Sequence, residues 1–444
     1  MSKKTKEQLE KDAQKPGIDA LKLHPFYKGK IETMVKCSVR SFDDFAVWYS
    51  PGVAAPCKDI SNNKSQVFEH TNKGNSIAIV SDGSRVLGLG DIGPEAGLPV
   101  MEGKALLFKY LGGVDAVPIM LDTKNKDEII RFCQVIAPTF GGLNLEDIES
   151  PKCFEILSEL QKTLPIPVWH DDQQGTALVV IAGLINAAKF VNKSFSKLRL
   201  SLIGSGAANV ALVRLLGKAG VDLSNVVVVD SRGIINLSRD ELRSNDIKWN
   251  IAQTTNKNQI TGGIKESLQD ADACIALSKP GPGIIQESWI KEMSDNPIVF
   301  ACANPVPEIW PWEAKNAGAS VVATGRSDFP NQVNNSLGFP GLFRGALDVR
   351  ALKLTDGMCL AAAYEIASYA EEKGLSETQI VPTMDELEVF AREAAAVAMK
   401  AIDEGVAQLK LDKSEVYENA LRVIKRSRDI TKNQMESGFI QPIP

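Results

Sequence analysis

The sequence predicts an α/β protein with two α/β domains, the second a Rossmann-type parallel sheet, and with C-terminal helices that pack back on both. Short apolar runs alternate with helical stretches up to about residue 345. Many of these runs end in turns rich in Gly, Pro or Asn, as buried parallel strands do. Beyond that point the pattern is helical. We therefore expect a first domain over residues 1–166, a second over 167–345, and a helical segment over 346–444 that completes both.

The first domain opens with the mixed-charge stretch MSKKTKEQLEKDAQKPG. It has no apolar core and contains several acids, so we interpret it as a solvated lead-in and not as a signal or transit peptide. The strand-like runs SIAIVSDG and AVPIMLD follow, with the helical stretches MEGKALLFKYLGG and KDEIIRFCQVIAPTFGG among them. The domain boundary is expected at TLPIPVWH, where two prolines precede the buried helix ALVVIAGLINAAKF.

The composition excludes several classes of function. The chain has 444 residues, of which 44% are hydrophobic and 24% charged, as in ordinary soluble proteins. A net charge of −5 gives no argument for a nucleic-acid surface, and no apolar run is long enough to span a membrane. The seven cysteines are odd in number and include no CxxC pair. This pattern indicates that the cysteines act as small buried apolar side chains in a cytoplasmic protein. It argues against disulfides and against a thiolate zinc site.

The segment KLRLSLIGSGAANVALVRLLGKAGVDLSNVVVVDSRG is typical of a dinucleotide-binding unit, with a strand, a glycine-rich turn, a helix and a second strand. Gly204 allows the tight turn, and Gly206 lets the backbone approach a pyrophosphate at the helix N-terminus. Asn209 stands where a third glycine is usual. Asp230 ends the second strand at about the spacing of an acid that binds the adenine ribose. The candidate cofactor residues are Gly204, Ser205, Gly206, Ala207, Ala208, Asn209, Asp230, Ser231 and Arg232.

The choice between NAD and NADP stays open in this segment. Asp230 would repel a 2′-phosphate, whereas Arg232, two residues further on, could bind one. The acid slightly favours NAD. A strand–turn–helix unit that binds no nucleotide is the alternative.

Two pairs of neighbouring acids stand out in the chain. Glu146 and Asp147 occur in GGLNLEDIESP, and Asp171 and Asp172 occur in HDDQQGTALVV. Each pair alone is more often a helix cap or a solvated turn. Together, without a Cys or His cluster and beside a nucleotide unit, they favour a hard divalent cation, Mg²⁺ or Mn²⁺. His170 beside them is more typical of a packing residue than of a ligand.

Charged side chains of the first domain could bind a substrate. Arg85 follows a strand-like run and could clamp a carboxylate through two parallel hydrogen bonds. Lys104 precedes ALLF, so desolvation could lower its pKa and make it a base. A carboxylate such as Asp171 would oppose that lowering and orient the amine. Taken alone, both cations are more often solvated, and Tyr49 and the asparagines of NQVNNSLGFPG are more often parts of turns.

Seven motifs occur along the chain in this order: YSPGVAAPC, DGSRVLGLGDIG, MEGKALLF, NLEDI, HDDQQGTA, GSGAAN and NNSLGFPG. Together they resemble the short, bacterial-type malic enzymes, and the resemblance extends from about residue 18 to about residue 400. It implies oxidation of L-malate with NAD or NADP and decarboxylation to pyruvate and CO₂, with Mg²⁺ or Mn²⁺. It also implies a homodimer, with the N-terminal segment as an interface element.

The resemblance implies roles for individual residues. Lys104 matches the general base for the C2 hydroxyl proton, Asp171 its partner, and Tyr49 the general acid that protonates the enolpyruvate carbon. The matching metal ligands are Glu146, Asp147 and Asp172, and the matching substrate contacts are Arg85, Asn304 and Asn335.

Two alternatives stay open from the sequence. A malolactic-type enzyme would use the same groups, retain its NAD and release lactate. A nucleotide-binding sensor would bind the cofactor without turnover, although the intact Lys104, Tyr49 and acidic residues argue against it.

Overall fold

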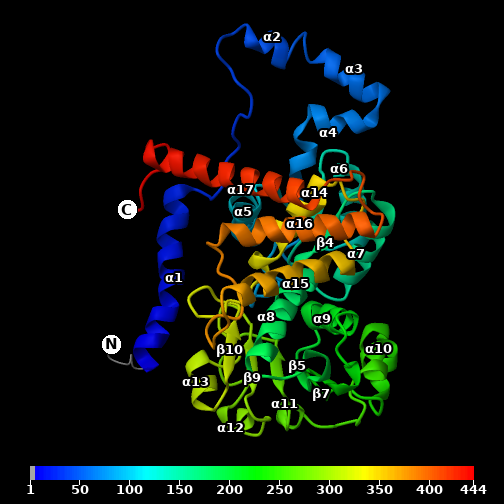
Figure 1. Ribbon diagram of the computed structural model, residues 1–444, viewed down its shortest axis with the longest axis vertical. Coiled ribbons are helices and arrows are strands. Elements are labelled where there is room, and N and C mark those ends of the chain that lie inside the picture. The colour runs from blue at the N-terminus through cyan, green and yellow to red at the C-terminus, as the bar shows by residue number, and fades with distance from the viewer. Residues whose placement is uncertain (1–5) are drawn as a thin grey trace.

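The computed structural model describes residues 6–444 of the chain (Figure 1). Its first α/β unit is built on a four-stranded parallel sheet with the order β2-β1-β3-β4. The strands are β1 (Ser76–Ser81), β2 (Asp115–Met120), β3 (Gly142–Leu145) and β4 (Val168–His170). Helices α5 (Pro94–Gly112), α6 (Lys126–Ile136) and α7 (Lys152–Thr163) connect them. The apolar side chains of β1 and β3 are fully buried, as their sequences predict.

Strand β4 lies beyond the boundary expected at residue 166. It pairs with β3, with Asn144 opposite Trp169 and Leu145 opposite His170. The prolines of TLPIPVWH therefore lead into the last strand of the first sheet. We propose that the first unit extends to His170, and that the second begins after it.

The second unit is a doubly wound sheet of the Rossmann type, as predicted. Its six strands have the order β10-β9-β8-β5-β6-β7 and are parallel except for β7. The strands are β5 (Leu200–Ile203), β6 (Val226–Asp230), β7 (Gly233–Ile234), β8 (Ala273–Ala276), β9 (Ile298–Ala301) and β10 (Val321–Thr324). The strand order reverses between β5 and β8, and such a switch point is where open α/β sheets bind ligands.

Helices cover this second sheet and join it to the first unit. The buried helix predicted after the acidic pair is α8 (Thr176–Phe190), whose side chains from Ala177 to Leu184 are almost wholly inaccessible. The other helices are α9 (Ala207–Lys218), α10 (Asp246–Thr254), α11 (Ile264–Leu268), α12 (Glu287–Ile290) and α13 (Pro311–Asn316).

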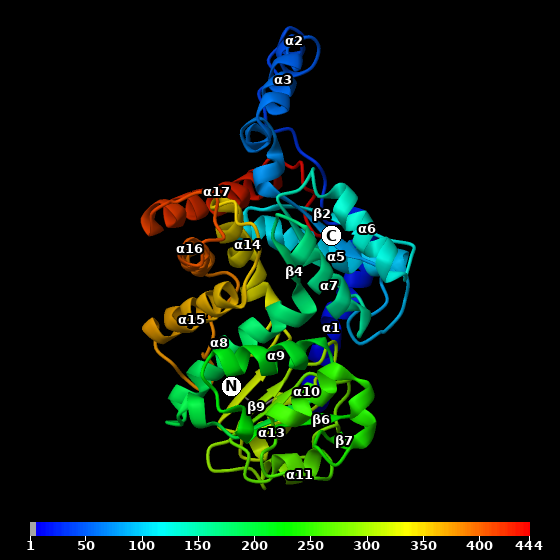
Figure 2. The same ribbon diagram turned by 90° about the vertical axis from the view of Figure 1, so that its right-hand side faces the viewer.

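The C-terminal helices pack back on both units, as predicted, and form a layer along one side of the molecule (Figure 2). They are α14 (Phe339–Asp348), α15 (Asp356–Glu372), α16 (Leu387–Asp403) and α17 (Lys413–Glu436). Asn186 of α8 donates to the carbonyl of Ala367 in α15 at 2.8 Å. The Ser427 hydroxyl of α17 donates to the carbonyl of Lys109 in α5 at 2.8 Å. One apolar core therefore runs through both units and these helices.

The N-terminal part of the chain stands apart from this core. Within the charged N-terminal stretch, residues 7–17 are largely exposed, and they lie in α1 (Lys6–Tyr27). The N-terminal arm, residues 31–63, carries α2 (Asp44–Trp48) and α3 (Ala54–Asn62) and projects beyond the body of the molecule in both views (Figures 1 and 2). Short α4 (Val67–His70) leads back to β1.

Two expectations from composition can be compared with the structure. Among residues 6–444, no helix is long and apolar enough to cross a membrane. The seven cysteines are free thiols, and five are buried as expected. Cys37 and Cys57 are exposed on the N-terminal arm, so the expectation of burial is wrong for these two.

Candidate active site

Lys104 lies at the centre of a buried group of acids. Its side chain projects from α5 and is 8% exposed. The Lys104 Nζ atom is 2.5 Å from Asp171 Oδ2 and 3.0 Å from Glu146 Oε1. Such charge-assisted contacts hold the amine in one direction. The structure thus brings together Lys104 and Asp171, which are far apart in the sequence.

The topology explains why the acids meet here. Glu146 and Asp147 follow β3, and Asp171 follows the neighbouring β4, so all three lie at the carboxyl edge of one parallel sheet. Asp171 begins a single π-helical turn that ends at Gly175. A Cβ atom on Gly175 would lie 2.0 Å from Asp171 Oδ1, so only glycine fits there. Asp171 is also held at the oxygen that does not contact Lys104, because the Trp169 indole donates to Asp171 Oδ1 at 2.9 Å.

Glu146, Asp147 and Asp172 form a group that could hold a cation. One carboxylate oxygen from each lies within 4.8 Å of the others. The Asp147 Oδ2 atom is buried and has no hydrogen-bond partner among the described residues, and Asn144 orients Glu146 through a 2.8 Å hydrogen bond. An unpartnered buried oxygen beside two further carboxylates fits a hard divalent cation. His170, also buried, places Nδ1 3.7 Å from Asp172 Oδ2.

The protonation of these groups follows from burial and crowding. Burial, with the neighbouring Asp172, raises the pKa of Asp147 to about 8, and burial raises the pKa of Glu146 well above its usual value. Burial would also lower the pKa of Lys104, as predicted, but Asp171 and Glu146 outweigh it and raise that pKa. The expected lowering is therefore wrong for the chain alone. A divalent cation held by Glu146, Asp147 and Asp172 would offset part of the negative charge that raises the Lys104 pKa, while Asp171 would still contact the amine.

These residues open into a cleft of about 470 Å³ between the two units. The first unit contributes Arg85, Lys104, Glu146 and Asp147, and Asp172 lies just after its last strand. The second contributes the glycine-rich turn and both predicted substrate amides, Asn304 and Asn335. A small substrate in this cleft would therefore contact the lysine, the acids and a nucleotide together.

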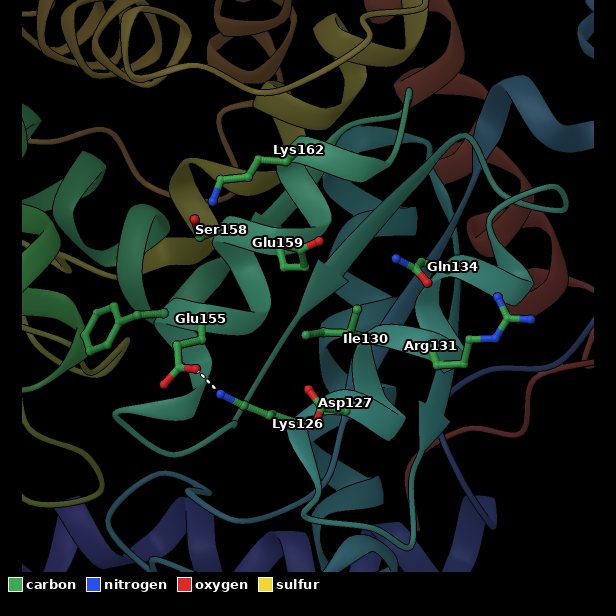
Figure 3. A pocket seen from close by; sticks show the side chains of 10 residues that line it. Lys126, Asp127, Ile130, Arg131, Gln134, Glu155, Ser158, Glu159 and Lys162 are labelled. Carbon is green, nitrogen blue, oxygen red and sulfur yellow. Dashed lines mark hydrogen bonds and ion pairs between the residues drawn. The ribbon is translucent and has the colours of Figure 1, made fainter.

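A second groove lies between α6 and α7 on the outer side of the first unit (Figure 3). Its volume is about 620 Å³, and an ion pair between Lys126 and Glu155 crosses it. None of the predicted site residues lines this groove. It has neither the buried acids nor the lysine of the cleft.

The glycine-rich turn after β5 has the geometry of a phosphate-binding turn. Gly204 has a φ of +103°, and a Cβ there would lie 2.5 Å from the Leu277 carbonyl oxygen. A Cβ on Gly206, at the start of α9, would meet no atom within 4 Å, so the helix N-terminus is open to a ligand. Asn209 is buried and donates to the carbonyls of Ile203 and Gly204 at 3.1 and 2.8 Å. The asparagine therefore fastens the turn where a glycine is usual.

Asp230 ends β6 beside this turn, since the Gly204 amide donates to Val229 at 2.8 Å. Ser231 and Arg232 follow in an exposed turn. The Asp230 carboxylate is bound by Arg239 and Lys248, which the sequence analysis missed because they come from a later loop and helix. Burial would raise the pKa of Asp230, but these two cations lower it to about 2.

Tyr49 is not brought to this cleft within one chain. It follows α2 on the N-terminal arm, is 73% exposed and does not line the cleft. Figures 1 and 2 show the arm projecting away from both sheets. Within a single chain, the structure therefore does not bring Tyr49 together with Lys104.

Glu308 is a site residue that the sequence analysis missed. It is fully buried and accepts hydrogen bonds from the Ser278 amide at 2.8 Å and the Ala303 amide at 3.0 Å. These bonds tie together the loops after β8 and β9, and the second loop carries Asn304. The only signal for it is an acid after the prolines of ANPVPE, which by itself is typical of a surface turn.

Comparisons with known proteins agree with this geometry. Residues 28–161 match the malic enzyme N-terminal domain, and residues 173–402 match the malic enzyme NAD binding domain. The chain is 48% identical over 405 residues to the bifunctional malic/malolactic enzyme of Bacillus subtilis, covering 91% of this chain and 98% of that protein. Other relatives are named NAD-dependent or NADP-dependent malic enzymes.

Solved structures show the same relationship. The Entamoeba histolytica malic enzyme superposes with a TM-score of 0.97 at 47% identity, covering 100% of this chain and 93% of that one. The malic enzyme of Pyrococcus horikoshii gives 0.88 at 51% identity, covering 92% and 96%. Two family domains side by side, and a shared fold over the full length, establish that the chain belongs to the malic enzyme family.

Proposed function

We propose that the protein oxidises L-malate and decarboxylates it to pyruvate and CO₂, with reduction of NAD or NADP and with Mg²⁺ or Mn²⁺. One observation carries this proposal. Lys104 contacts Asp171 and Glu146, and Glu146 belongs to the acidic group with Asp147 and Asp172. The nucleotide-binding turn lines the same cleft as Lys104 and this acidic group. This arrangement suits removal of a hydroxyl proton next to a hydride acceptor.

Lys104 is the general base in this proposal. It takes the proton of the C2 hydroxyl, and Asp171 holds the amine in place through the 2.5 Å contact. Glu146, Asp147 and Asp172 would hold the cation. When bound, the cation supplies Lewis-acid polarisation of oxygen, and the nicotinamide accepts the hydride.

Three residues of the cleft are proposed to bind malate. The guanidinium of Arg85 is exposed in the cleft and can pair with a carboxylate in two parallel bonds. Asn304 and Asn335 approach from the second unit. Because malate would contact both units, their approach on binding would exclude water from the reaction.

The enolpyruvate carbon needs a proton, and one chain offers no phenol for it. Among the described residues, no tyrosine lines the cleft. Cys302 does line it, but burial raises the pKa of this thiol well above its usual value, which makes it a weak acid. We propose that two chains form a homodimer in which each N-terminal arm carries Tyr49 into the partner's cleft. The arm supports this, because its exposed side chains include Phe42, Val47, Trp48 and Tyr49. Large apolar patches on a projecting segment are typical of an interface between chains.

The first test is a spectrophotometric assay at 340 nm with L-malate and Mn²⁺, run with NAD and NADP in parallel. We expect malate-dependent reduction with at least one cofactor, and loss of the signal with EDTA. Nucleotide binding without turnover under any of these conditions would favour the sensor instead.

A malolactic activity is the second candidate, because the Bacillus subtilis relative is named for both reactions. Both reactions would use the same lysine and acids. Enzymatic measurement of lactate separates them. Lactate formed without net reduction at 340 nm would identify malolactic turnover, whereas we expect pyruvate as the main product.

Asp172→Asn should weaken Mn²⁺ binding by at least about 10-fold, since even residues that only support metal ligands contribute this much to affinity. The amide can still accept the Asp147 backbone hydrogen bond of 2.8 Å, so the free energy of unfolding should change by less than about 1 kcal/mol. Mn²⁺ titration followed by electron paramagnetic resonance measures the affinity. Glu149→Gln is the matched control, because Glu149 lines the cleft outside the cluster. An unchanged titration in Asp172→Asn would remove Asp172 from the ligand set.

A further inference from the structure

A cluster of charged side chains surrounds the carboxyl end of β6. We call it the Asp230 cluster: Asp230, Arg232, Arg239, Glu241 and Lys248. It lies beside the glycine-rich turn, because β6 pairs with β5 up to Val229. In a dinucleotide-binding unit, this end of the second strand is where the adenine ribose binds.

Asp230 has no free acceptor position in this cluster. Its Oδ1 atom accepts from the Arg232 amide at 2.9 Å and from Arg239 at 2.8 Å. Its Oδ2 atom accepts from Arg239 at 3.2 Å and from Lys248 at 2.8 Å. A carboxylate offers about four lone-pair positions, so all are filled. The Asp230 side chain is also only 3% exposed, and it is therefore poorly placed to accept ribose hydroxyls.

The cations of the cluster retain free donors that face solvent. Most of the Arg239 donors are engaged, because Nε donates to Glu241 at 2.9 Å and Nη1 also donates to the Gly233 carbonyl at 3.1 Å. Lys248 makes one hydrogen bond among the described residues and has three donors, and the exposed Arg232 guanidinium makes none. The cluster has three cations against two acids, so its net charge is positive. The neighbouring Arg243 is balanced by Asp240.

We propose that this cluster selects NADP, with Arg232 and Lys248 binding the adenosine 2′-phosphate and Asp230 serving as an anchor for the basic side chains. The inference rests on the proposed function and specifies its cofactor. It reverses the slight preference for NAD that Asp230 alone suggested, because that reasoning took the carboxylate to be unpaired. Because Asp230 is paired and the cluster as a whole is positively charged, the cluster attracts a 2′-phosphate and does not repel it.

Equilibrium binding tests this inference without turnover. We expect the full-length protein to bind NADPH at least about 10-fold more tightly than NADH at low salt, because charge-assisted bonds to phosphate are worth an order of magnitude or more in affinity. Nucleotide fluorescence gives both Kd values. The gap should narrow as salt is added. The double variant Arg232→Gln, Lys248→Gln should lose about 10-fold or more in NADPH affinity and keep its NADH affinity.

Two further variants make the result decisive. Lys218→Gln removes the same charge at the far end of α9 and should leave both Kd values unchanged. Asp230→Asn should change NADH affinity by less than about threefold if the carboxylate is only an anchor. A wild type that binds NADH as tightly as NADPH, or a tenfold loss of NADH affinity in Asp230→Asn, would overturn the inference. NADPH preference without malate turnover would instead reject the proposed function and leave this inference standing.

Discussion

Lys104→Ala should lower kcat by about 100- to 10,000-fold, the usual contribution of a positioned general base. The Kd for the reduced cofactor should stay within about threefold, because the nucleotide turn belongs to the other unit. The variant leaves Asp171 and Glu146 buried without their cation, so its folding has to be measured by thermal unfolding alongside the kinetics.

Chemical rescue makes this prediction specific. A small primary amine such as methylamine can enter the space of the missing side chain and should restore part of the activity if Lys104 acts as a base. Lys109→Ala is the matched control, because Lys109 lies on the same helix and pairs with Asp115 at the surface. Full activity in Lys104→Ala would refute the assignment, and so would a loss of activity that tracks only a loss of folded protein.

A heterodimer of Tyr49→Phe and Lys104→Ala chains should be active although each parent homodimer is nearly inactive. If Tyr49 acts in the partner's cleft, one site of the heterodimer combines an intact Lys104 with an intact Tyr49. The other site lacks both groups. The heterodimer should therefore retain about half of the wild-type kcat per dimer, as the two-fold symmetry requires.

Co-expression with two different affinity tags gives the heterodimer in pure form for this measurement. The matched control pairs Tyr49→Phe with wild type, which should retain about half the activity in either arrangement of the arm. An inactive Tyr49→Phe, Lys104→Ala heterodimer would place Tyr49 in the cleft of its own chain. A monomer in solution at assay concentration would rule out the exchange of arms altogether.

Local patterns predicted the fold well where one segment determines its own conformation. The strand, glycine turn and helix around Gly204 lie as expected, because a positive φ and an open helix N-terminus depend only on neighbouring residues. The burial of α8 was equally visible in its apolar sequence. By contrast, the prolines before β4 suggested a boundary, since pairing with β3 is a long-range contact that leaves no local signal.

The site was less predictable, because its properties depend on neighbours in space. No spacing in the sequence shows that Asp171 contacts Lys104; the resemblance to a family supplied that pairing, and the structure shows the contact. The sequence suggested both a lowering of the Lys104 pKa by burial and an opposing effect of Asp171, but it could not show that Asp171 and Glu146 together outweigh burial. Asp230 was treated as unpaired because Arg239 and Lys248 reach it from other elements.

The most direct test of the account is the stoichiometry of products formed from L-malate by the wild-type protein with Mn²⁺. We expect pyruvate, CO₂ and reduced nicotinamide cofactor in equal amounts, measured in one reaction by enzymatic pyruvate assay, CO₂ trapping and absorbance at 340 nm. All three should fall together in Lys104→Ala. Reduced cofactor without CO₂, or lactate in place of pyruvate, would contradict the account.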